Sequence, residues 1–109
     1  MELDHYTRES EYGYAELKKG TAEEEANGTV WLDTLLIEEE NRGSGEGTRL
    51  LQDILDDAFE FGCKKVVVHA MTLEFIEYQP LIEQFYIKNG FSIDKDYVIH
   101  QGKIMSIQL

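Results

Sequence analysis

The sequence has one cysteine, one proline, no long apolar run and few basic residues relative to its acidic ones. The 109 residues include 22 Asp and Glu against 10 Lys and Arg, a formal net charge of -12. This charge repels the phosphates of nucleic acids, so we expect no nucleic-acid partner, whereas a cationic partner suits the field. The alternative is that the acidic surface merely keeps the protein soluble. A single cysteine excludes an intramolecular disulfide, and neither a signal peptide nor a membrane span is apparent. We therefore expect a cytoplasmic protein with no membrane partner.

Length and composition predict one globular domain over residues 1–109. Apolar residues make up 42% of the chain and aromatic residues 11%, which is typical of a folded protein. Domains of roughly 100 to 150 residues are the commonest size, and a chain with one proline and no internal repeat offers no obvious linker. We expect Cys63, which follows a glycine at the end of a predicted helix, to pack as a small apolar residue rather than act as a nucleophile.

Hydrophobic periodicity predicts a mixed α+β (α/β) fold, with a central sheet of about five to seven strands and two main helices. Residues 29–37, TVWLDTLLI, are typical of a mostly buried strand. From Thr48 onward, apolar residues recur at helical spacing until a glycine at position 62. Pro80 suits the first turn of a second helix, which is expected to end at Gly90. The other predicted strands are residues 2–8, 12–19, 64–70, 91–93, 96–100 and 103–109.

The order of these elements predicts their connections. The first two strands are close in sequence and are expected to form a hairpin. The segment GTAEEEANG is expected to be a solvated loop, with a turn at Asn27 and Gly28. The sequence strand, loop, helix, strand from residue 29 to residue 70 predicts a βαβ unit with two parallel strands.

The connection between the buried strand and the first helix, NRGSGEGTRLL, has three glycines at alternate positions. The first N–H groups of a helix lack partners and its macrodipole is positive there, so the four residues from Gly45 to Thr48 are well placed to bind an anion. Arg42 adds a charged contact, and the Thr48 hydroxyl adds a hydrogen bond. The alternative is a tight turn that needs only the conformational freedom of glycine.

Two common phosphate-binding loops do not fit this segment. A nucleotide-triphosphatase P-loop ends in Gly-Lys-Ser/Thr, whereas Gly47 is followed by Thr48 and Arg49. A dinucleotide-binding loop has the spacing G-x-G-x-x-G and an acidic residue near the end of the next strand. Here the spacing is G-x-G-x-G, and that strand ends with His69 and Ala70.

A third pattern does fit, because Arg42-Gly43-Ser44-Gly45-Glu46-Gly47 resembles the acyl-CoA loop, Arg/Gln-x-x-Gly-x-Gly/Ala, of the GNAT superfamily of N-acetyltransferases. A second segment, QFYIKNGF at residues 84–91, is similar to that family's aromatic-Tyr-x-x-x-Gly-Phe segment. The resemblance covers about residues 11–109. It implies the GNAT fold and acetyl-CoA as a co-substrate, and we expect no metal site.

The resemblance also implies which residues contact the cofactor. In that family the pantetheine arm lies between two splayed parallel strands, so the backbone of Leu36 and Ile37 is implied to bind it, with one amide polarising the thioester carbonyl. Residues 42–48 are implied to hold the pyrophosphate. Gln79 stands where the family often has an asparagine that contacts the cofactor. Lys88 is placed to reach the phosphates or, alternatively, is a solvated cation near a helix end.

Tyr86 matches the tyrosine that, in much of the family, protonates the leaving thiolate. A phenol has a pKa of about 10 and an ordinary thiol one of about 8.5, so this proton transfer is only mildly uphill. The alternative role for Tyr86 is that of a core aromatic residue beside Phe85 on an amphipathic helix.

The attacking amine must also lose a proton, and no motif chooses its acceptor. Asp33 is our candidate base. It is four residues from Ile37, and residues an even number apart in a strand are expected to share a face. Glu38, just past the end of that strand, and His69, on the partner strand, are alternatives, and so is a chain of water molecules.

Three departures from the family pattern bear on function. Glu46 occupies a loop position that is commonly apolar, and its carboxylate would weaken pyrophosphate binding unless it points away. The acidic residues 38–40 lie near the acyl end of the expected site and either attract an ammonium group or are merely solvated. Only about 28 residues precede the strand at 29–37, where family members usually have elements that wall the acceptor pocket. Either the acceptor site is open, or a second subunit of a homodimer completes it, or acceptor chemistry has been lost.

The sequence thus predicts an N-acetyltransferase that moves an acetyl group from acetyl-CoA to a primary amine by direct attack in a ternary complex. The acceptor is a small cationic amine or the lysine or N-terminus of a protein. The principal alternative is a non-catalytic module with the GNAT fold that binds CoA or contacts other proteins. A third reading is a purely structural protein whose glycine loop is only a turn.

Overall fold

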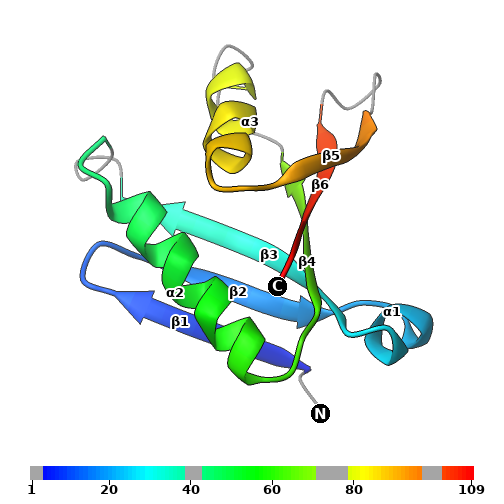
Figure 1. The fold of residues 1–109 in the computed structure, drawn as a ribbon. Helices are drawn as coiled ribbons and strands as arrows, with labels where there is room; N and C mark the ends of the chain where they lie inside the picture. The colour runs from blue at the N-terminus through cyan, green and yellow to red at the C-terminus, as the bar shows by residue number, and fades with distance from the viewer. Residues whose placement is uncertain (1–3, 39–42, 71–78, 97–101) are drawn as a thin grey trace.

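A computed structural model describes residues 4–38, 43–70, 79–96 and 102–109 of the chain (Figure 1). It contains six strands and three helices among these residues, so the predicted mixed α+β fold is confirmed. The predicted strand at residues 96–100 lies almost entirely outside the described residues. The elements are β1 (His5–Ser10), β2 (Gly13–Lys19), α1 (Ala22–Ala26), β3 (Thr29–Ile37), α2 (Glu46–Glu60), β4 (Lys65–Ala70), α3 (Gln79–Lys88), β5 (Ser92–Asp96) and β6 (Lys103–Gln108).

The six strands form one sheet in the order β1-β2-β3-β4-β6-β5. The predicted N-terminal hairpin is confirmed, because β1 pairs with β2 in an antiparallel ladder. The predicted βαβ unit is confirmed as well, since β3 and β4 are parallel neighbours joined through α2. Within the described residues, the other pairs of neighbouring strands are antiparallel.

The core lies between the sheet and the two longer helices. Alternate residues of the strands, such as Val30 and Leu32 in β3, are buried against apolar residues of α2 such as Leu51 and Ile54. Tyr86 of α3 belongs to the same core cluster, so α2 and α3 cover the same face of the sheet. The amphipathic pattern that predicted α2 therefore follows from its burial on one side.

The prediction that GTAEEEANG is a solvated loop was wrong, because residues Ala22–Ala26 form the short helix α1. Thr21 caps this helix: its hydroxyl accepts a hydrogen bond from the N–H of Glu24, and the Glu24 carboxylate accepts one from the N–H of Thr21. This reciprocal pair is a capping box, and its spacing, Thr-x-x-Glu, is visible in the sequence. Hydrophobic periodicity does not reveal this helix, because it buries no residue of its own.

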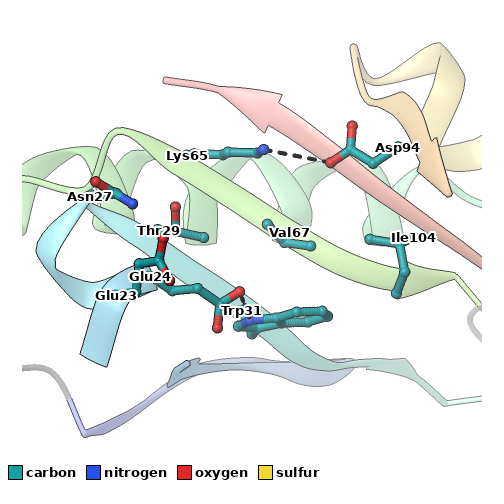
Figure 2. A pocket seen from close by; sticks show the side chains of 9 residues that line it. All are labelled: Glu23, Glu24, Asn27, Thr29, Trp31, Lys65, Val67, Asp94 and Ile104. Atoms are coloured by element: carbon teal, nitrogen blue, oxygen red, sulfur yellow. Dashed lines mark hydrogen bonds and ion pairs between the residues drawn. The ribbon is translucent and has the colours of Figure 1, made fainter. Parts of the chain in front are cut away.

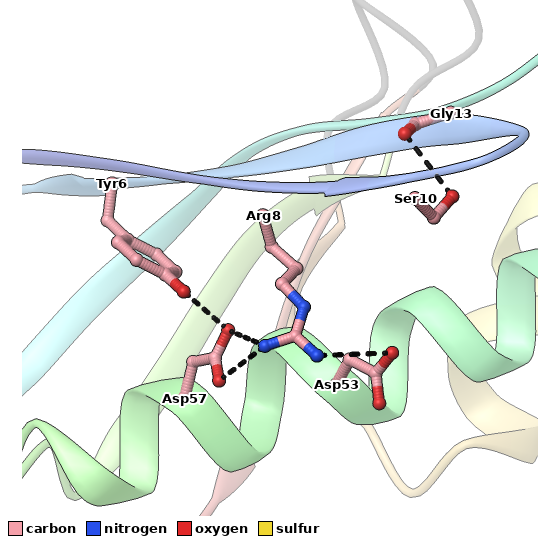
Figure 3. A network of polar contacts seen from close by, with 6 residues as sticks. All are labelled: Tyr6, Arg8, Ser10, Gly13, Asp53 and Asp57. Carbon is pink, nitrogen blue, oxygen red and sulfur yellow. Dashed lines mark hydrogen bonds and ion pairs between the residues drawn. The ribbon is translucent and has the colours of Figure 1, made fainter.

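The edge strand β1 is fastened to α2 by a polar network (Figure 3). The Tyr6 hydroxyl donates to Asp57 at 2.8 Å, and the Arg8 guanidinium donates to both oxygens of Asp57 at 3.1 Å. Asp53, one turn earlier on α2, lies 3.7 Å from Arg8. The hydrogen bond to Asp57, aided by burial, raises the pKa of Tyr6. The network adds a link from β1 to α2 to the backbone pairing of β1 with β2.

The parallel ladder between β3 and β4 is short, and β3 has a bulge at the point where this ladder ends. The ladder runs from the pair of Thr29 with Lys65 to that of Leu32 with Val68. On the other side of β3, Glu16 pairs with Thr34 and the next residue of β2 pairs with Leu32, which leaves Asp33 as an extra residue in a bulge. Figure 1 shows the C-terminal ends of β3 and β4 diverging beyond this point.

Candidate functional site

The site lies where β3 and β4 separate, and it begins with the loop that follows β3. Gly43 and Gly45 have φ angles of 84° and 86°, the left-handed region that L side chains rarely adopt. No atom within the described residues lies within 4 Å of where a Cβ would stand at either glycine. The two glycines therefore satisfy a backbone requirement while leaving space above the loop. Arg42, the charged residue predicted to join them, lies outside the described residues.

The first turn of α2 offers the predicted anion site. The helix begins at Glu46, two residues earlier than the periodicity suggested, and its N-cap Gly45 has no side chain to satisfy the first N–H groups. Those groups and the positive end of the helix dipole favour a negative ligand. Thr48 is exposed in this turn, as is Ser44 in the loop.

The carboxylate of Glu46, which raised doubt about phosphate binding, has a partner on its own helix. Its Oε1 lies 3.4 Å from the Arg49 guanidinium, and only 16% of the Glu46 side chain is exposed. The ion pair neutralises the charge closest to the helix start. Residues three apart lie on the same face of a helix, so this spacing brings the two side chains together.

Gly47 is where the three elements of the site meet. A Cβ placed on Gly47 would lie 3.6 Å from Ile37 at the end of β3 and 3.6 Å from the ring of Phe85 on α3. The start of α2, the end of β3 and the middle of α3 are therefore packed together. Sequence reasoning noted Phe85 only as a neighbour of Tyr86 and did not assign it this contact.

The end of β3 presents the two residues implied to bind pantetheine. Leu36 pairs with Tyr14 and Ile37 with Gly13, both of β2, and both lie beyond the last pair of the ladder with β4. Leu36 is 41% exposed, whereas Ile37 packs against the core. The edge of β3 that faces β4 is therefore not covered by that strand beyond Leu32.

Tyr86 is buried on the same face of the sheet as α2. Only 6% of the residue is exposed, and its ring makes edge-to-face contacts with Phe85 at 5.3 Å and Phe91 at 5.2 Å. Its hydroxyl has no recorded hydrogen bond, yet no fully buried side-chain polar atom of the described residues lacks a partner. The hydroxyl is therefore not fully buried. Burial raises the pKa of Tyr86 well above its ordinary value, so the phenol stays protonated.

Gln79 anchors the first turn of α3 to the end of β4. Its amide donates to the Ala70 carbonyl at 2.8 Å and to the Glu83 carboxylate at 2.7 Å, and the residue is buried. Glu83 also binds the Lys103 ammonium of β6 at 2.6 Å. Burial alone would raise the pKa of Glu83, but the hydrogen bonds from Lys103 and Gln79 outweigh it and hold that pKa below the ordinary value. Sequence reasoning missed Glu83 and Lys103, which are far apart along the chain.

The candidate proton acceptors flank the start of the gap. Asp33 and His69 are the next residues after the last pair of the parallel ladder, and both are exposed, as is Glu38 beyond β3. The bulge at Asp33 breaks the alternation of β3, so shared parity with Ile37 does not by itself place Asp33 on the same face. Lys88 is exposed in the last turn of α3.

Other classes of site are not apparent in the part of the chain that the structure describes. No three His, Cys, Asp or Glu side chains there are grouped so as to hold a metal ion. None of the described helices has the length and apolar character needed to cross a membrane.

A mixed sheet with a splayed parallel pair, followed by a glycine loop at a helix start, defines a class of protein that can hold an extended ligand along a strand edge and an anion at the helix start. The sequence matches the family model described as the acetyltransferase (GNAT) family over residues 12–77, which is more than half of the chain. The chain belongs to the GNAT acetyltransferase family. The family uses acetyl-CoA, so the predicted cofactor is confirmed at the level of the family. No curated protein matches the sequence significantly.

Solved structures with the same fold are distant in sequence. The PaiA N-acetyltransferase of Thermoplasma acidophilum, in complex with coenzyme A, has 20% identity and a TM-score of 0.71 over 98% of this chain and 62% of that one. A GNAT family acetyltransferase of Elizabethkingia anophelis with acetyl-CoA bound has 17% identity and a TM-score of 0.69 over 90% and 69%. The anti-CRISPR protein AcrVA5 has 23% identity and a TM-score of 0.71 over 95% and 98%. The chain thus spans less than two thirds of the Thermoplasma structure.

Proposed function

We propose that residues 1–109 act as one domain that transfers an acetyl group from acetyl-CoA to a primary amine by direct attack in a ternary complex. The observation that carries the proposal is the separation of β3 and β4 directly beside the glycine loop and the first turn of α2. An extended ligand can bind along the edge of β3 that β4 does not cover, while its phosphates bind at the helix start.

The described residues fit acetyl-CoA at both ends of this path. The space above Gly43 and Gly45 and the uncapped N–H groups of α2 suit the diphosphate, and the Glu46–Arg49 ion pair reduces the repulsion that Glu46 would otherwise cause. Leu36 and Ile37 lie at the end of β3, where backbone groups would orient the pantetheine arm. Arg42, Ser44, Thr48 and Lys88 remain proposed phosphate contacts. Gln79 is proposed to act on the cofactor site through the position of α3, since its amide binds Ala70 and Glu83.

Acetyl-CoA supplies an acyl group on a thioester, which a neutral amine can attack. The chain must then provide a proton for the thiolate that leaves and an acceptor for the proton of the amine. Tyr86 is proposed as the donor, because its hydroxyl is protonated and not fully buried. The burial that raises its pKa also makes it a weaker acid than a free phenol, so the transfer is more uphill than ordinary pKa values imply and depends on a thiolate whose own basicity is raised by the same dry surroundings. Asp33 is proposed as the acceptor, with His69, Glu38 or a water chain as alternatives, because Asp33 and His69 flank the start of the gap.

Cys63 supports direct attack rather than a covalent enzyme intermediate. It is 4% exposed in the core, and burial raises the pKa of its thiol. A thiol that is both buried and protonated is a poor nucleophile.

The decisive experiment measures binding and turnover separately. Acetyl-CoA at one hundred times its dissociation constant should stabilise the folded protein by about 2.7 kcal/mol, which a thermal shift detects. Release of coenzyme A with a panel of primary amines then tests turnover. A thermal shift without release of coenzyme A would favour the non-catalytic CoA-binding module, and no thermal shift would overturn the proposal.

A further inference from the structure

The face of the sheet opposite α2 and α3 contains a pocket that the proposed cofactor site does not use. In β3, Trp31 lies between the core residues Val30 and Leu32, and in β4, Val67 lies between Val66 and Val68. Because alternate residues of a strand point to opposite faces, Trp31 and Val67 point away from the core. A pocket of about 370 Å³ opens there, lined by Glu23, Glu24, Asn27, Thr29, Trp31, Lys65, Val67, Asp94 and Ile104 (Figure 2).

The ring of Trp31 is held in this pocket by hydrogen bonds. Its indole N–H donates to Glu24 at 3.0 Å, and Glu24 is itself fixed by the capping box with Thr21. The hydrogen bond from the Thr21 backbone is the largest cause of the lowered pKa of Glu24, which therefore stays ionised. The aromatic face is thus placed before any ligand arrives.

The charge of the pocket is negative. It has three carboxylates, from Glu23, Glu24 and Asp94, and one ammonium, from Lys65, which lies 3.5 Å from Asp94. Glu23 is exposed and its carboxylate makes no recorded contact within the described ranges. A tryptophan face with nearby carboxylates suits a positively charged side chain, through cation–π and ionic interactions.

The pocket lies next to the gap between β3 and β4 where the reaction is proposed to occur. Lys65, Val67 and His69 alternate along β4 on one face, and His69 lies where β3 and β4 separate. Residues two apart in an extended chain are about 7 Å apart. With the cofactor proposed to bind on the side of α2, an extended peptide on the opposite face could present an amine at the gap and a second residue at the pocket.

We propose that this pocket binds a positively charged side chain next to the acceptor lysine of a protein, and so selects basic protein segments over small amines. The inference rests on the proposed function for the identity of the reaction. A small amine that reaches the gap does not also fill the pocket, whereas a polypeptide with an arginine or lysine two residues away does.

Binding in the pocket can be measured without acetyl-CoA, because Trp31 is the single tryptophan of the chain. N-acetyl-arginine amide should change the Trp31 fluorescence with saturation, and the neutral isostere N-acetyl-citrulline amide should not. Glu23→Gln should raise the dissociation constant about two- to fivefold. Glu25→Gln, the same change on α1 at a residue that does not line the pocket, should leave it unaltered. Equal responses to the two probes, or equal effects of the two variants, would overturn the inference.

Turnover tests the link to acetylation. A peptide with arginine two residues from its lysine should have a kcat/KM about two- to fivefold higher than the same peptide with citrulline, and Glu23→Gln should reduce this preference while Glu25→Gln leaves it unaltered. Equal rates for the two peptides would overturn the inference and leave the proposed function standing. If no peptide or amine is acetylated, the proposed function fails, and the fluorescence titration still decides whether the pocket binds cations.

Discussion

Leu32 of β3 and Val68 of β4 are the last partners in the parallel ladder at the centre of the sheet. Beyond them β3 continues against β2 as far as Ile37, and β4 continues against β6 as far as Ala70. Each strand is therefore held by its outer neighbour while the two inner edges separate. The opening is supported by the hydrogen bonds of the sheet itself, so it does not depend on a bound ligand.

Tyr86→Phe should lower kcat about 100-fold with little change in KM, because it removes the proposed proton donor and keeps the ring. The contacts with Phe85 and Phe91 are retained, and the hydroxyl has no recorded hydrogen bond to lose. The stability of the variant should therefore stay close to that of the wild type. The rate of coenzyme A release measures kcat, and thermal unfolding measures the stability. An unchanged kcat would exclude Tyr86 as the donor.

Gly45→Ala should destabilise the protein by about 1–2 kcal/mol and weaken acetyl-CoA binding, because alanine resists the left-handed conformation that the loop needs. Gly62→Ala is the matched control at the other end of α2. Its φ is 87°, and like Gly45 it has no atom within 4 Å of an added Cβ in the described structure. The control should lose similar stability and keep its affinity, as measured by calorimetry. Equal affinities for the two variants would contradict the proposed phosphate site.

Arg49→Ala should raise the KM for acetyl-CoA about two- to fivefold, because it leaves the Glu46 carboxylate unneutralised beside the proposed diphosphate site. Adding Glu46→Gln to this variant should restore the KM, since the repulsive charge is then gone. Titration at low ionic strength gives the largest effect, because salt screens exposed charges. A KM that stays high in the double variant would mean that Arg49 acts in another way.

Glu83 should make stability depend on acidic pH. Its pKa is held below the ordinary value of 4.5 in the folded protein, so the ionised form favours folding above pH 4.5. This contribution is lost as the pH falls from 4.5 through the lower folded pKa, because protonation breaks the contacts with Lys103 and Gln79. Glu83→Gln should therefore reduce stability near neutral pH and flatten its decline in acid. Urea unfolding between pH 3 and pH 7 tests this, and an unaltered slope would contradict it.

Much of the fold could be predicted from the sequence, because the spacing of apolar residues and the positions of glycines agree with the helices and strands that form. The buried strand Thr29–Ile37 was predicted with the bounds that the structure has, and α3 ends before Gly90 as expected. The short helix α1 was missed, since it buries no residue of its own and depends on its capping box. The bulge at Asp33 could not be predicted, because it results from how β2 and β3 pair rather than from any local preference.

The candidate site divides in the same way. The glycine loop and its place at a helix start could be predicted, because glycine spacing has a direct conformational meaning. The Phe85 contact with Gly47 and the hydrogen bond from Gln79 to Ala70 could not, because each joins residues that are distant in sequence or lie on different elements. Gln79 is the clearest example: its contact with the cofactor stays a prediction, whereas the hydrogen bonds that its amide donates to Ala70 and Glu83 could not be predicted.

The burial of Cys63 matters for assays that detect released coenzyme A with a thiol-reactive reagent. Reagents that develop colour on reaction with a free thiol attack the thiolate, and this side chain is 4% exposed with its pKa raised by burial. The native protein should therefore contribute almost no background in such an assay. Colour that develops in step with unfolding would then come from Cys63, while colour that develops at once in the folded sample would come from the product.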